Sequence, residues 1–186
     1  MLSETFSEAL TYCYKLHCKQ QRKGTEIPYV SHLLQVAGMV LEAGAEEEVA
    51  IAALLHDAVE DQGGDETALE IEQRFGGRVA QLVLSLSDSH TIPKPPWRKR
   101  KEAFLARLRN GTPDMFVIAA ADKLHNLRSI LNDHASIGEE IWSRFNGGRD
   151  GTLWYYQEVA DILQEKFRSS LTEQFLRENR KLQQLA

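Results

Sequence analysis

Apolar residues recur every three to four positions along almost all of this chain, which is the period of an amphipathic α-helix. In the first such segment Phe6, Leu10, Tyr14 and Cys18 fall on one helical face. No alternating strand pattern of useful length interrupts this period. The sequence therefore predicts an all-α bundle of about nine or ten helices. After the first segment, helices are predicted at 33–41, 46–61, 65–75, 78–86, 98–109, 114–131, 137–145, 153–167 and 172–185.

Local signals mark several boundaries of these helices. Thr112 is suited to cap a helix start and Pro113 to occupy its first position. Gly44 is suited to end the second helix, and Asp65 to cap the one that follows the Gly63–Gly64 pair. The segment 87–97 carries three prolines and is predicted to be a loop.

Size and composition indicate one domain over residues 1–186. The amphipathic C-terminal helix 172–185 is expected to pack on this bundle, and packing on another subunit is the alternative. The longest apolar run, 49–55, is far too short to span a membrane, and no secretory signal is evident. Cys13 and Cys18 are expected to be ordinary thiols in a reducing cytoplasm. A net charge of −5 argues against general nucleic-acid binding.

The segment 56–61 has several side chains that can bind a metal or transfer a proton. His56, Asp57, Glu60 and Asp61 fall within six residues, after a run of apolar residues. On one continuous helix, His56 and Glu60 lie one turn apart, as do Asp57 and Asp61, so all four project from one side. A divalent cation would offset the repulsion between these carboxylates. The alternative is a solvated acidic helix end.

Two further residues complete a candidate metal site. His32 opens the second helix, and Asp122 directly follows the apolar residues 119–121 inside a predicted helix, where a charge is costly unless it is paired or metal-bound. Together with His56 and Asp57 they make a set of two nitrogen and two oxygen ligands, which suits Mn²⁺, Fe²⁺, Co²⁺ or Zn²⁺. Taken singly, His32 could be a core histidine, and Asp122 could pair with Lys123 or Arg128.

The chain resembles the HD superfamily of metal-dependent phosphohydrolases, and more closely the hydrolase domain of RelA/SpoT homologues of the small alarmone hydrolase type. The similarity extends from about residue 6 to residue 167. The matching segments are 22–24, 28–32, 35–38, 56–61, 75–76, 121–128 and 154–155. The combination of Glu60 and Asp61 with 122–126 is far more specific than the His-Asp pair alone.

The resemblance implies an HD-domain bundle that uses Mn²⁺ or another divalent transition metal to hydrolyse the 3′-pyrophosphate of (p)ppGpp, giving pyrophosphate and GDP or GTP. It implies that Glu60 and Asp61 orient and deprotonate the attacking water. The implied metal ligands are His32, His56, Asp57 and Asp122. The implied substrate contacts are Arg22, Lys23, Asn126 and Tyr155.

Two departures from the family bear on the base that is recognised. Leu33 stands where many relatives have proline, and 84–88 differs from the corresponding segment of the long bifunctional enzymes. The chain also leaves no room for a synthetase domain, so a hydrolase-only protein is expected.

Several alternatives stay open from sequence. An HD phosphohydrolase for adenosine alarmones, for another nucleotide or for the NADPH phosphate is the second hypothesis. A third, a binding module without turnover, is disfavoured by the presence of Glu60 and Asp61. The basic segment 94–101 could receive phosphates or be a solvated loop. The sequence leaves the resident metal and the oligomeric state open.

Overall fold

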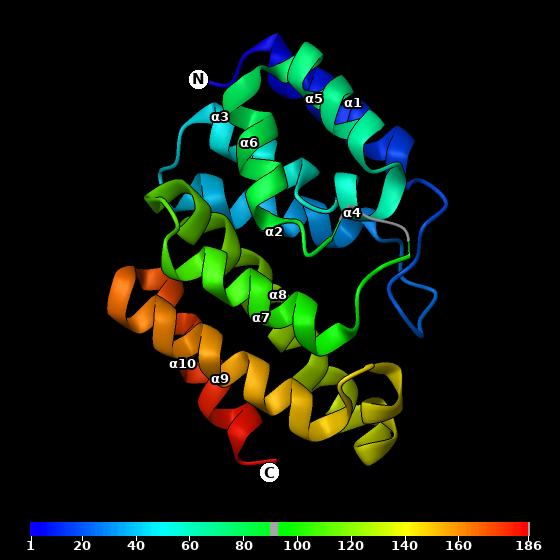
Figure 1. The fold of residues 1–186 in the computed structure, drawn as a ribbon, viewed down its shortest axis with the longest axis vertical. Coiled ribbons are helices and arrows are strands. Elements are labelled where there is room, and N and C mark those ends of the chain that lie inside the picture. The colour runs from blue at the N-terminus through cyan, green and yellow to red at the C-terminus, as the bar shows by residue number, and fades with distance from the viewer. Residues whose placement is uncertain (90–92, 186) are drawn as a thin grey trace. The chain divides into compact units, whose positions relative to one another are not determined.

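The computed structural model describes residues 1–89 and 93–185. Within these residues the secondary structure is helical, apart from one isolated bridge between Gln21 and Pro28, and the predicted all-α class is confirmed (Figure 1). The chain divides into two compact units, Met1–Pro95 and Pro96–Ala186. The single domain predicted over 1–186 stays a prediction; residues 90–92 of the predicted loop, and residue 186, lie outside the described part.

The first unit is built around a buried central helix. This helix, α3 (Glu47–Leu55), buries every residue of the apolar run 49–55 and packs against α1, α2 and α6. A helix that is apolar on all sides has to be enclosed by its neighbours, which is why it lies at the centre. The other helices of this unit are α1 (Glu4–His17), α2 (Val30–Glu42), α4 (Ala58–Gln62), α5 (Asp65–Phe75) and α6 (Gly77–Leu86).

The continuous helix predicted over 46–61 is wrong, because the structure divides it in two. Helix α3 ends at Leu55, with His56 as its C-cap, and α4 begins at Ala58. Asp57 has φ −98° and ψ −3°, which lie in the right-handed helical region but depart from the ideal α-helical angles, and the His56 ring bonds back to the Ala53 carbonyl at 2.8 Å. Asp57 and Asp61 keep their one-turn relation because Asp57 caps α4, whereas His56 and Glu60 stand on different helices.

The second unit is centred on the long helix α8 (Pro113–Ile137). Helix α10 (Ser170–Gln183) packs on α8 and on α9 (Gly148–Lys166), while α7 (Trp97–Arg109) packs on α9. The predicted start of α8 is confirmed: the Thr112 hydroxyl accepts a hydrogen bond from the Met115 amide, and proline follows the cap. The helix runs six residues beyond the predicted end at Leu131 and stops at Gly138, whose φ of 62° favours glycine.

The region between α8 and α9 departs from the prediction. The helix predicted over 137–145 is a 3₁₀ segment, η1 (Gly138–Arg144). Helix α9 begins at Gly148, before the predicted start at residue 153, so Gly148 and Gly151 lie in its first turn. The Trp97 ring lies against Gly147 and Gly151, where a larger side chain would collide with it. The glycines of this region therefore make room for an aromatic ring.

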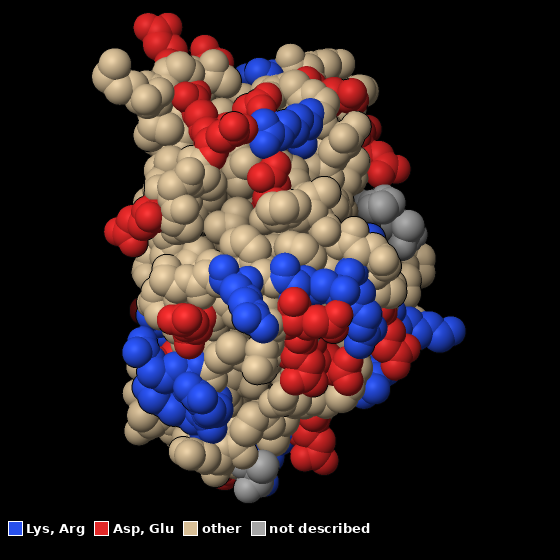
Figure 2. Space-filling model, turned by 90° about the vertical axis from the view of Figure 1, so that its left-hand side faces the viewer, with Lys and Arg blue, Asp and Glu red and all other residues tan. Residues whose placement is uncertain are grey.

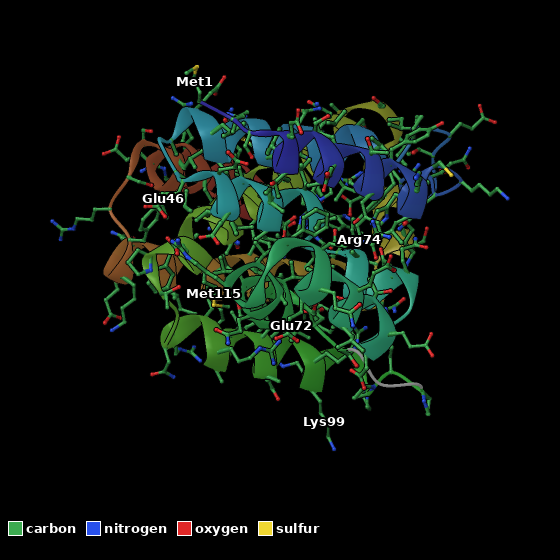
Figure 3. All side chains as sticks on the ribbon, turned by 90° about the horizontal axis from the view of Figure 1, so that it is seen from above. Met1, Glu46, Glu72, Arg74, Lys99 and Met115 are labelled. Carbon is green, nitrogen blue, oxygen red and sulfur yellow. The ribbon has the colours of Figure 1, made fainter. Side chains whose placement is uncertain are left out.

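Charged side chains of both signs are interspersed on the molecular face drawn in Figure 2. In the basic segment 94–101, the exposed Lys99 side chain extends away from α7 (Figure 3). None of the helices in the described ranges has both the length and the apolar character needed to cross a membrane.

Candidate metal centre and active site

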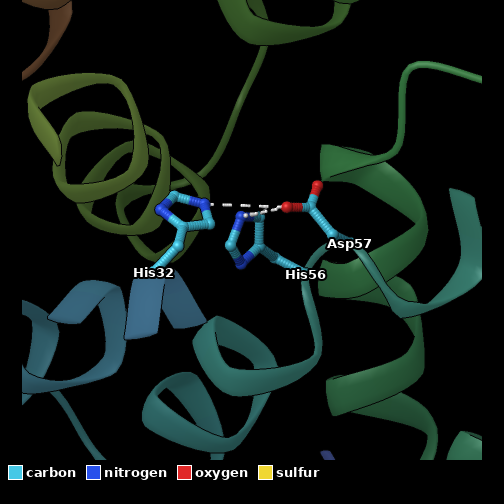
Figure 4. A group of neighbouring side chains, drawn as sticks. All are labelled: His32, His56 and Asp57. Atoms are coloured by element: carbon cyan, nitrogen blue, oxygen red, sulfur yellow. Dashed lines mark ion pairs between the residues drawn. The ribbon is translucent and has the colours of Figure 1, made fainter. Parts of the chain in front are cut away.

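Three side chains of the first unit converge on one point. One ligand atom from each of His32, His56 and Asp57 lies within 4.8 Å of the other two. The Nε2 atoms of His32 and His56 lie 3.7 Å and 3.0 Å, respectively, from the same carboxylate oxygen, Asp57 Oδ2 (Figure 4). The structure therefore brings together three of the four residues predicted as metal ligands.

The packing of α2 against α3 positions the two histidines. His32 lies in the first turn of α2 and is fully buried, and His56 caps the C-terminus of α3 with 3% of its surface exposed. The His56 Nδ1 atom lies 2.8 Å from the Ala53 carbonyl oxygen, which can only accept a hydrogen bond. Nδ1 therefore carries the proton, and in the neutral ring Nε2 presents its lone pair towards Asp57.

Asp57 is held in place by Tyr29. The Tyr29 hydroxyl donates to Asp57 Oδ2 at 2.5 Å, while the Tyr29 ring meets the His32 ring edge-on with centroids 5.4 Å apart. Asp57 keeps 24% of its side chain exposed, so solvent can reach the Asp57 side chain. A hydrogen bond to a ligating carboxylate from outside the ligand set is a regular feature of protein metal sites.

This arrangement fits a divalent cation. The His56 Nε2 lone pair and the Asp57 Oδ2 atom are both electron-rich and stand 3.0 Å apart, a contact that a shared positive charge relieves. Imidazole nitrogens and a carboxylate oxygen suit Mn²⁺, Fe²⁺, Co²⁺ or Zn²⁺. The candidate centre is thus a mixed nitrogen and oxygen site with one half-exposed ligand.

Asp122 belongs to the second unit, so its place as the fourth ligand stays a prediction. It is buried in the middle of α8. Its Oδ1 accepts from Asn126 Nδ2 and its Oδ2 from Lys123 Nζ, each at 2.5 Å. The structure thus contains the pairing with Lys123 that was the alternative reading of Asp122, and it adds a hydrogen bond from Asn126, one turn further along α8.

Glu60 and Asp61, the predicted water-activating pair, lie side by side in sequence on α4. Glu60 accepts from the backbone amide of Asp88 and from Lys94 Nζ, both at 3.1 Å. Asp61 accepts from Gln20 Nε2 at 2.8 Å and has Lys94 Nζ at 3.9 Å. Burial raises the pKa of Asp61 and the charge of Asp57 acts in the same direction, while the bond from Gln20 lowers it.

Two of the predicted substrate contacts lie in the loop between α1 and α2. The Arg22 guanidinium lies 5.8 Å from the centre of the Tyr29 ring, and Lys23 is exposed. The loop is closed by a hydrogen bond from the Arg22 amide to the Ile27 carbonyl at 2.8 Å. These cations therefore stand on a loop that also carries a partner of the metal-site residue Asp57.

The other two predicted substrate contacts are in the second unit. Asn126 bonds to Asp122, as described above. Tyr155, on α9, is 5% exposed, with Lys101 Nζ 4.7 Å and Lys123 Nζ 5.9 Å from its ring centre. Tyr155 is therefore a buried aromatic ring beside two cations, and its role in binding substrate stays a prediction.

Sequence reasoning missed the residues that hold the acidic groups. Tyr29 entered only as part of a motif, and its contact with Asp57 was not foreseen. Gln20, which donates to Asp61, and Asp88, whose amide reaches Glu60, carry no sequence signal that distinguishes them from surface polar residues. Spacing could have hinted only at Tyr29, which precedes His32 by three residues and so lies within one helical turn of it.

The chain matches the family model described as HD domain over residues 9–153. It is 38% identical over 126 residues to the human protein named guanosine-3′,5′-bis(diphosphate) 3′-pyrophosphohydrolase MESH1, covering 66% of this chain and 68% of that protein. It is 34% identical over 128 residues to the guanosine-3′,5′-bis(diphosphate) 3′-pyrophosphohydrolase of Aquifex aeolicus, covering 69% of this chain but 18% of that longer protein.

Solved structures agree with these relatives. A structure described as a metazoan ortholog of SpoT that hydrolyses ppGpp has a TM-score of 0.78 and 29% sequence identity, covering 100% of this chain and 99% of its own. A Listeria monocytogenes protein has a TM-score of 0.70 and 34% identity, covering 81% of this chain and 97% of its own. The expected HD-domain bundle is thereby confirmed. The chain belongs to the HD-domain family and, within it, to the group of guanosine-3′,5′-bis(diphosphate) 3′-pyrophosphohydrolases.

Proposed function

We propose that this protein hydrolyses the 3′-pyrophosphate of (p)ppGpp, releasing pyrophosphate and GDP or GTP. The observation that carries the proposal is the convergence of His32, His56 and Asp57 in a chain that belongs to this family of hydrolases. Water attacks the phosphorus atom bonded to the 3′ oxygen, and the bond between that phosphorus and the 3′ oxygen breaks. The 3′ oxygen takes up a proton and stays with GDP or GTP, while the water oxygen becomes part of the released pyrophosphate.

In this proposal His32, His56, Asp57 and Asp122 hold one Mn²⁺ ion. When bound, the cation supplies positive charge that offsets the charge of the phosphates and makes a nearby water molecule more acidic. The contribution of the chain is to hold the nitrogen and oxygen donors in fixed positions. Tyr29 does this for Asp57, and the Ala53 carbonyl does it for His56.

Glu60 and Asp61 take the roles of water-orienting and proton-accepting groups. Both carboxylates are partly exposed, at 18% and 27% of the side chain, so each can meet a water molecule. Each is also fixed by a hydrogen bond from the surrounding structure, Glu60 by the Asp88 amide and Asp61 by Gln20. A carboxylate that is held in a fixed position within reach of water is suited to this step.

The substrate carries several phosphate charges, for which the chain offers cations. Arg22 and Lys23 are proposed to receive phosphates, and Asn126 and Tyr155 to contact the ribose, a phosphate or the base. Lys94, which already lies beside Glu60, is the member of the basic segment best placed to join them. Arginine and lysine differ in this task, since arginine binds phosphate through a rigid two-pronged donor and lysine through a single charge.

The remaining sequence-based predictions fit this function. We propose that 1–186 acts as one HD-type domain, that it works in the cytoplasm, and that its partner is a small nucleotide and not a nucleic acid. The exposed Cys18 thiol, which forms no disulfide, is compatible with a reducing compartment.

The deciding experiment is a Mn²⁺-dependent hydrolysis assay on ppGpp, pppGpp, their adenosine analogues and NADPH, with products separated by chromatography. We expect pyrophosphate with GDP from ppGpp and with GTP from pppGpp, and loss of both after chelation. The Asp57→Ala variant is the matched inactive control. Faster cleavage of the adenosine compounds or of NADPH would favour the alternative substrates, and cleavage of none of the 3′-pyrophosphates would eliminate the proposal.

A further inference from the structure

The Gln20 side chain is the centre of a hydrogen-bond network behind Asp61. Its Oε1 lies 2.7 Å from His17 Nδ1 and accepts from Gln62 Nε2 at 2.6 Å. Its Nε2 donates to Asp61 Oδ2 at 2.8 Å. The three partners come from α1 and α4, and they occupy both ends of the Gln20 amide.

This network permits one orientation of the amide. Because Gln20 Nε2 donates to the Asp61 carboxylate, the Gln20 NH₂ group faces Asp61 and the Gln20 oxygen faces the other way. That oxygen then accepts from His17, so Nδ1 is the protonated nitrogen of the ring. Burial lowers the pKa of His17, which keeps the ring neutral and Nε2 unprotonated.

The packing around His17 fixes the ring in turn. His17 is fully buried, and the Tyr29 ring stacks on it with centroids 5.6 Å apart and planes 28° apart. The backbone ties the same residues together, because the Tyr29 amide donates to the Gln20 carbonyl at 2.9 Å and the Gln20 amide to the His17 carbonyl at 3.0 Å. A side chain enclosed in this way has one rotamer available, so it can act as a fixed support.

We propose that His17 is a positioning residue for the reaction, acting through Gln20 to hold the Asp61 carboxylate in its working orientation. This inference rests on the proposed role of Asp61 in activating water. His17 donates to the Gln20 oxygen, that bond prevents the amide from rotating, and the NH₂ group is thereby kept on Asp61. The ring has no role on the substrate itself.

Loss of this support is expected to lower kcat and leave KM nearly unchanged. Displacing a proton acceptor by a fraction of an ångström reduces the share of productive geometries, and removing a supporting hydrogen bond at a site of this kind typically lowers activity by about 10–100-fold. Phosphate binding by Arg22 and Lys23 does not depend on the orientation of Asp61. Mn²⁺ affinity is expected to stay the same, because His17 is not among the proposed ligands.

Three substitutions of His17 separate positioning from simple packing. An asparagine amide nitrogen is the same number of bonds from the backbone as Nδ1, whereas the glutamine amide nitrogen is one bond further, near Nε2. If the bond to Gln20 matters, His17→Asn retains kcat to within a few-fold, and His17→Gln and His17→Ala lose about tenfold or more. A packing role alone predicts the reverse order, since glutamine fills more of the space than asparagine. Thermal unfolding of all three variants checks that they are folded.

A double-mutant cycle tests whether His17 acts through Gln20 and Asp61. We expect His17→Ala to lower kcat no further when Gln20→Leu or Asp61→Asn is already present, because residues in one chain of contacts are not additive. Additive losses would overturn the proposed relay and assign His17 an independent effect.

The protonation of His17 gives a readout that does not depend on turnover. In ¹⁵N-histidine NMR spectra, we expect His17 to carry its proton on Nδ1, and the Gln20→Leu variant to lose this preference. Protonation on Nε2 in the unmodified protein would overturn the inference. If the protein cleaves its nucleotide but His17→Gln and His17→Asn have the same kcat, the inference fails and the proposed function stands. If the protein cleaves none of the 3′-pyrophosphates, both the inference and the proposed function fail.

Discussion

Tyr29 donates its hydroxyl to Asp57 Oδ2 at 2.5 Å, on the same oxygen atom that lies 3.0 Å from His56 Nε2. One oxygen of the Asp57 carboxylate therefore accepts a hydrogen bond from the Tyr29 phenol and also faces the histidine. Supporting hydrogen bonds of this kind orient a ligand before the metal arrives, so that less freedom is lost on binding.

Replacing Tyr29 by phenylalanine removes this support and keeps the ring. We expect the Tyr29→Phe variant to bind Mn²⁺ about tenfold more weakly or worse, in the range typical of lost supporting bonds at metal sites. Calorimetric titration with Mn²⁺ measures the change directly. Tyr14→Phe is the matched control, because the Tyr14 side chain lies on the surface, 61% exposed, and should leave the affinity unchanged. Equal affinity in the unmodified protein and in Tyr29→Phe would contradict a supporting role for the hydroxyl.

Asp57 and Glu60 are expected to fail in different ways when replaced by alanine. Asp57→Ala, like Asp122→Ala, should abolish both Mn²⁺ binding and turnover, because it removes a ligand. Glu60→Ala should still bind Mn²⁺ but lose at least about 100-fold in kcat, the usual size of a general acid–base contribution. Parallel Mn²⁺ titrations and rate measurements on each variant separate the two roles. Full activity of Glu60→Ala would show that another group handles the proton.

Lys94 provides a test of the basic segment. Its Nζ lies 3.1 Å from Glu60 Oε1 and its side chain is 40% exposed, so it is near the reacting groups and accessible to a phosphate. We expect Lys94→Ala to raise KM for ppGpp by about tenfold, since charge-assisted hydrogen bonds contribute about 1.5–3 kcal/mol. The effect should shrink as salt is added. Lys99→Ala is the control, because Lys99 extends away from α7 (Figure 3), and it should change KM little.

Helices that depend on local signals were predictable, whereas the break between α3 and α4 was not. The start of α8 follows from Thr112 and Pro113 themselves, which supply a hydroxyl and a fixed φ angle wherever the helix packs. The break at 56–57 contains neither glycine nor proline. It depends on the His56 ring bonding to the Ala53 carbonyl and on the backbone angles of Asp57, which tertiary packing sets.

The 3₁₀ segment η1 shows a second limit. Ile137, Ile141 and Phe145 are spaced four residues apart, as on a helix, yet an α-helix and a 3₁₀-helix differ by about half a residue per turn, which so short a stretch cannot resolve. The period therefore predicts that this segment is helical and does not predict which kind of helix it forms.

At the candidate site, the sequence predicted the three residues that converge in the first unit but not the residues that hold them in place. His32, His56 and Asp57 could be found because imidazole and carboxylate groups beside an apolar run are unusual. Gln20 could not, because glutamine is common on protein surfaces and its partner Asp61 lies 41 residues away. A contact over that distance depends on how the segment after α1 is arranged against α4, which the hydrophobic pattern of the helices does not contain.

The two thiols should differ in their reaction with Ellman's reagent. Cys13 is 1% exposed, and burial raises the pKa of its thiol to about 12, whereas Cys18 is exposed. Because the thiolate is the reactive form, we expect one thiol to react at pH 8 in the folded protein and two after denaturation. Reaction of both thiols in the folded state would contradict the burial of Cys13.

The same pKa shift predicts a loss of stability in alkali. An acid whose pKa is raised by folding stabilises the folded state. This contribution is complete at a pH below the ordinary pKa of the thiol, 9.0, and is lost as the pH rises towards 12. Tyr12, whose pKa is also raised to about 12, acts in the same direction. We expect the free energy of unfolding, measured with urea, to fall from pH 9 upwards. The free energy of unfolding should fall less steeply with pH in Cys13→Ala. An equally steep fall in this variant would exclude the thiol as its source.

Gly147 and Gly38 should respond in opposite directions to alanine. A Cβ atom at Gly147 would meet three atoms of the Trp97 ring at 2.6 to 2.8 Å, although its φ of −85° suits any residue, so the collision alone should destabilise the protein by about 1–3 kcal/mol. Gly38 lies inside α2 with nothing within 4 Å of such an atom, and Gly38→Ala should stabilise by about 0.5–1 kcal/mol. Urea unfolding curves measure both changes. If Gly147→Ala were as stable as the unmodified protein, the Trp97 ring could not pack closely against this glycine.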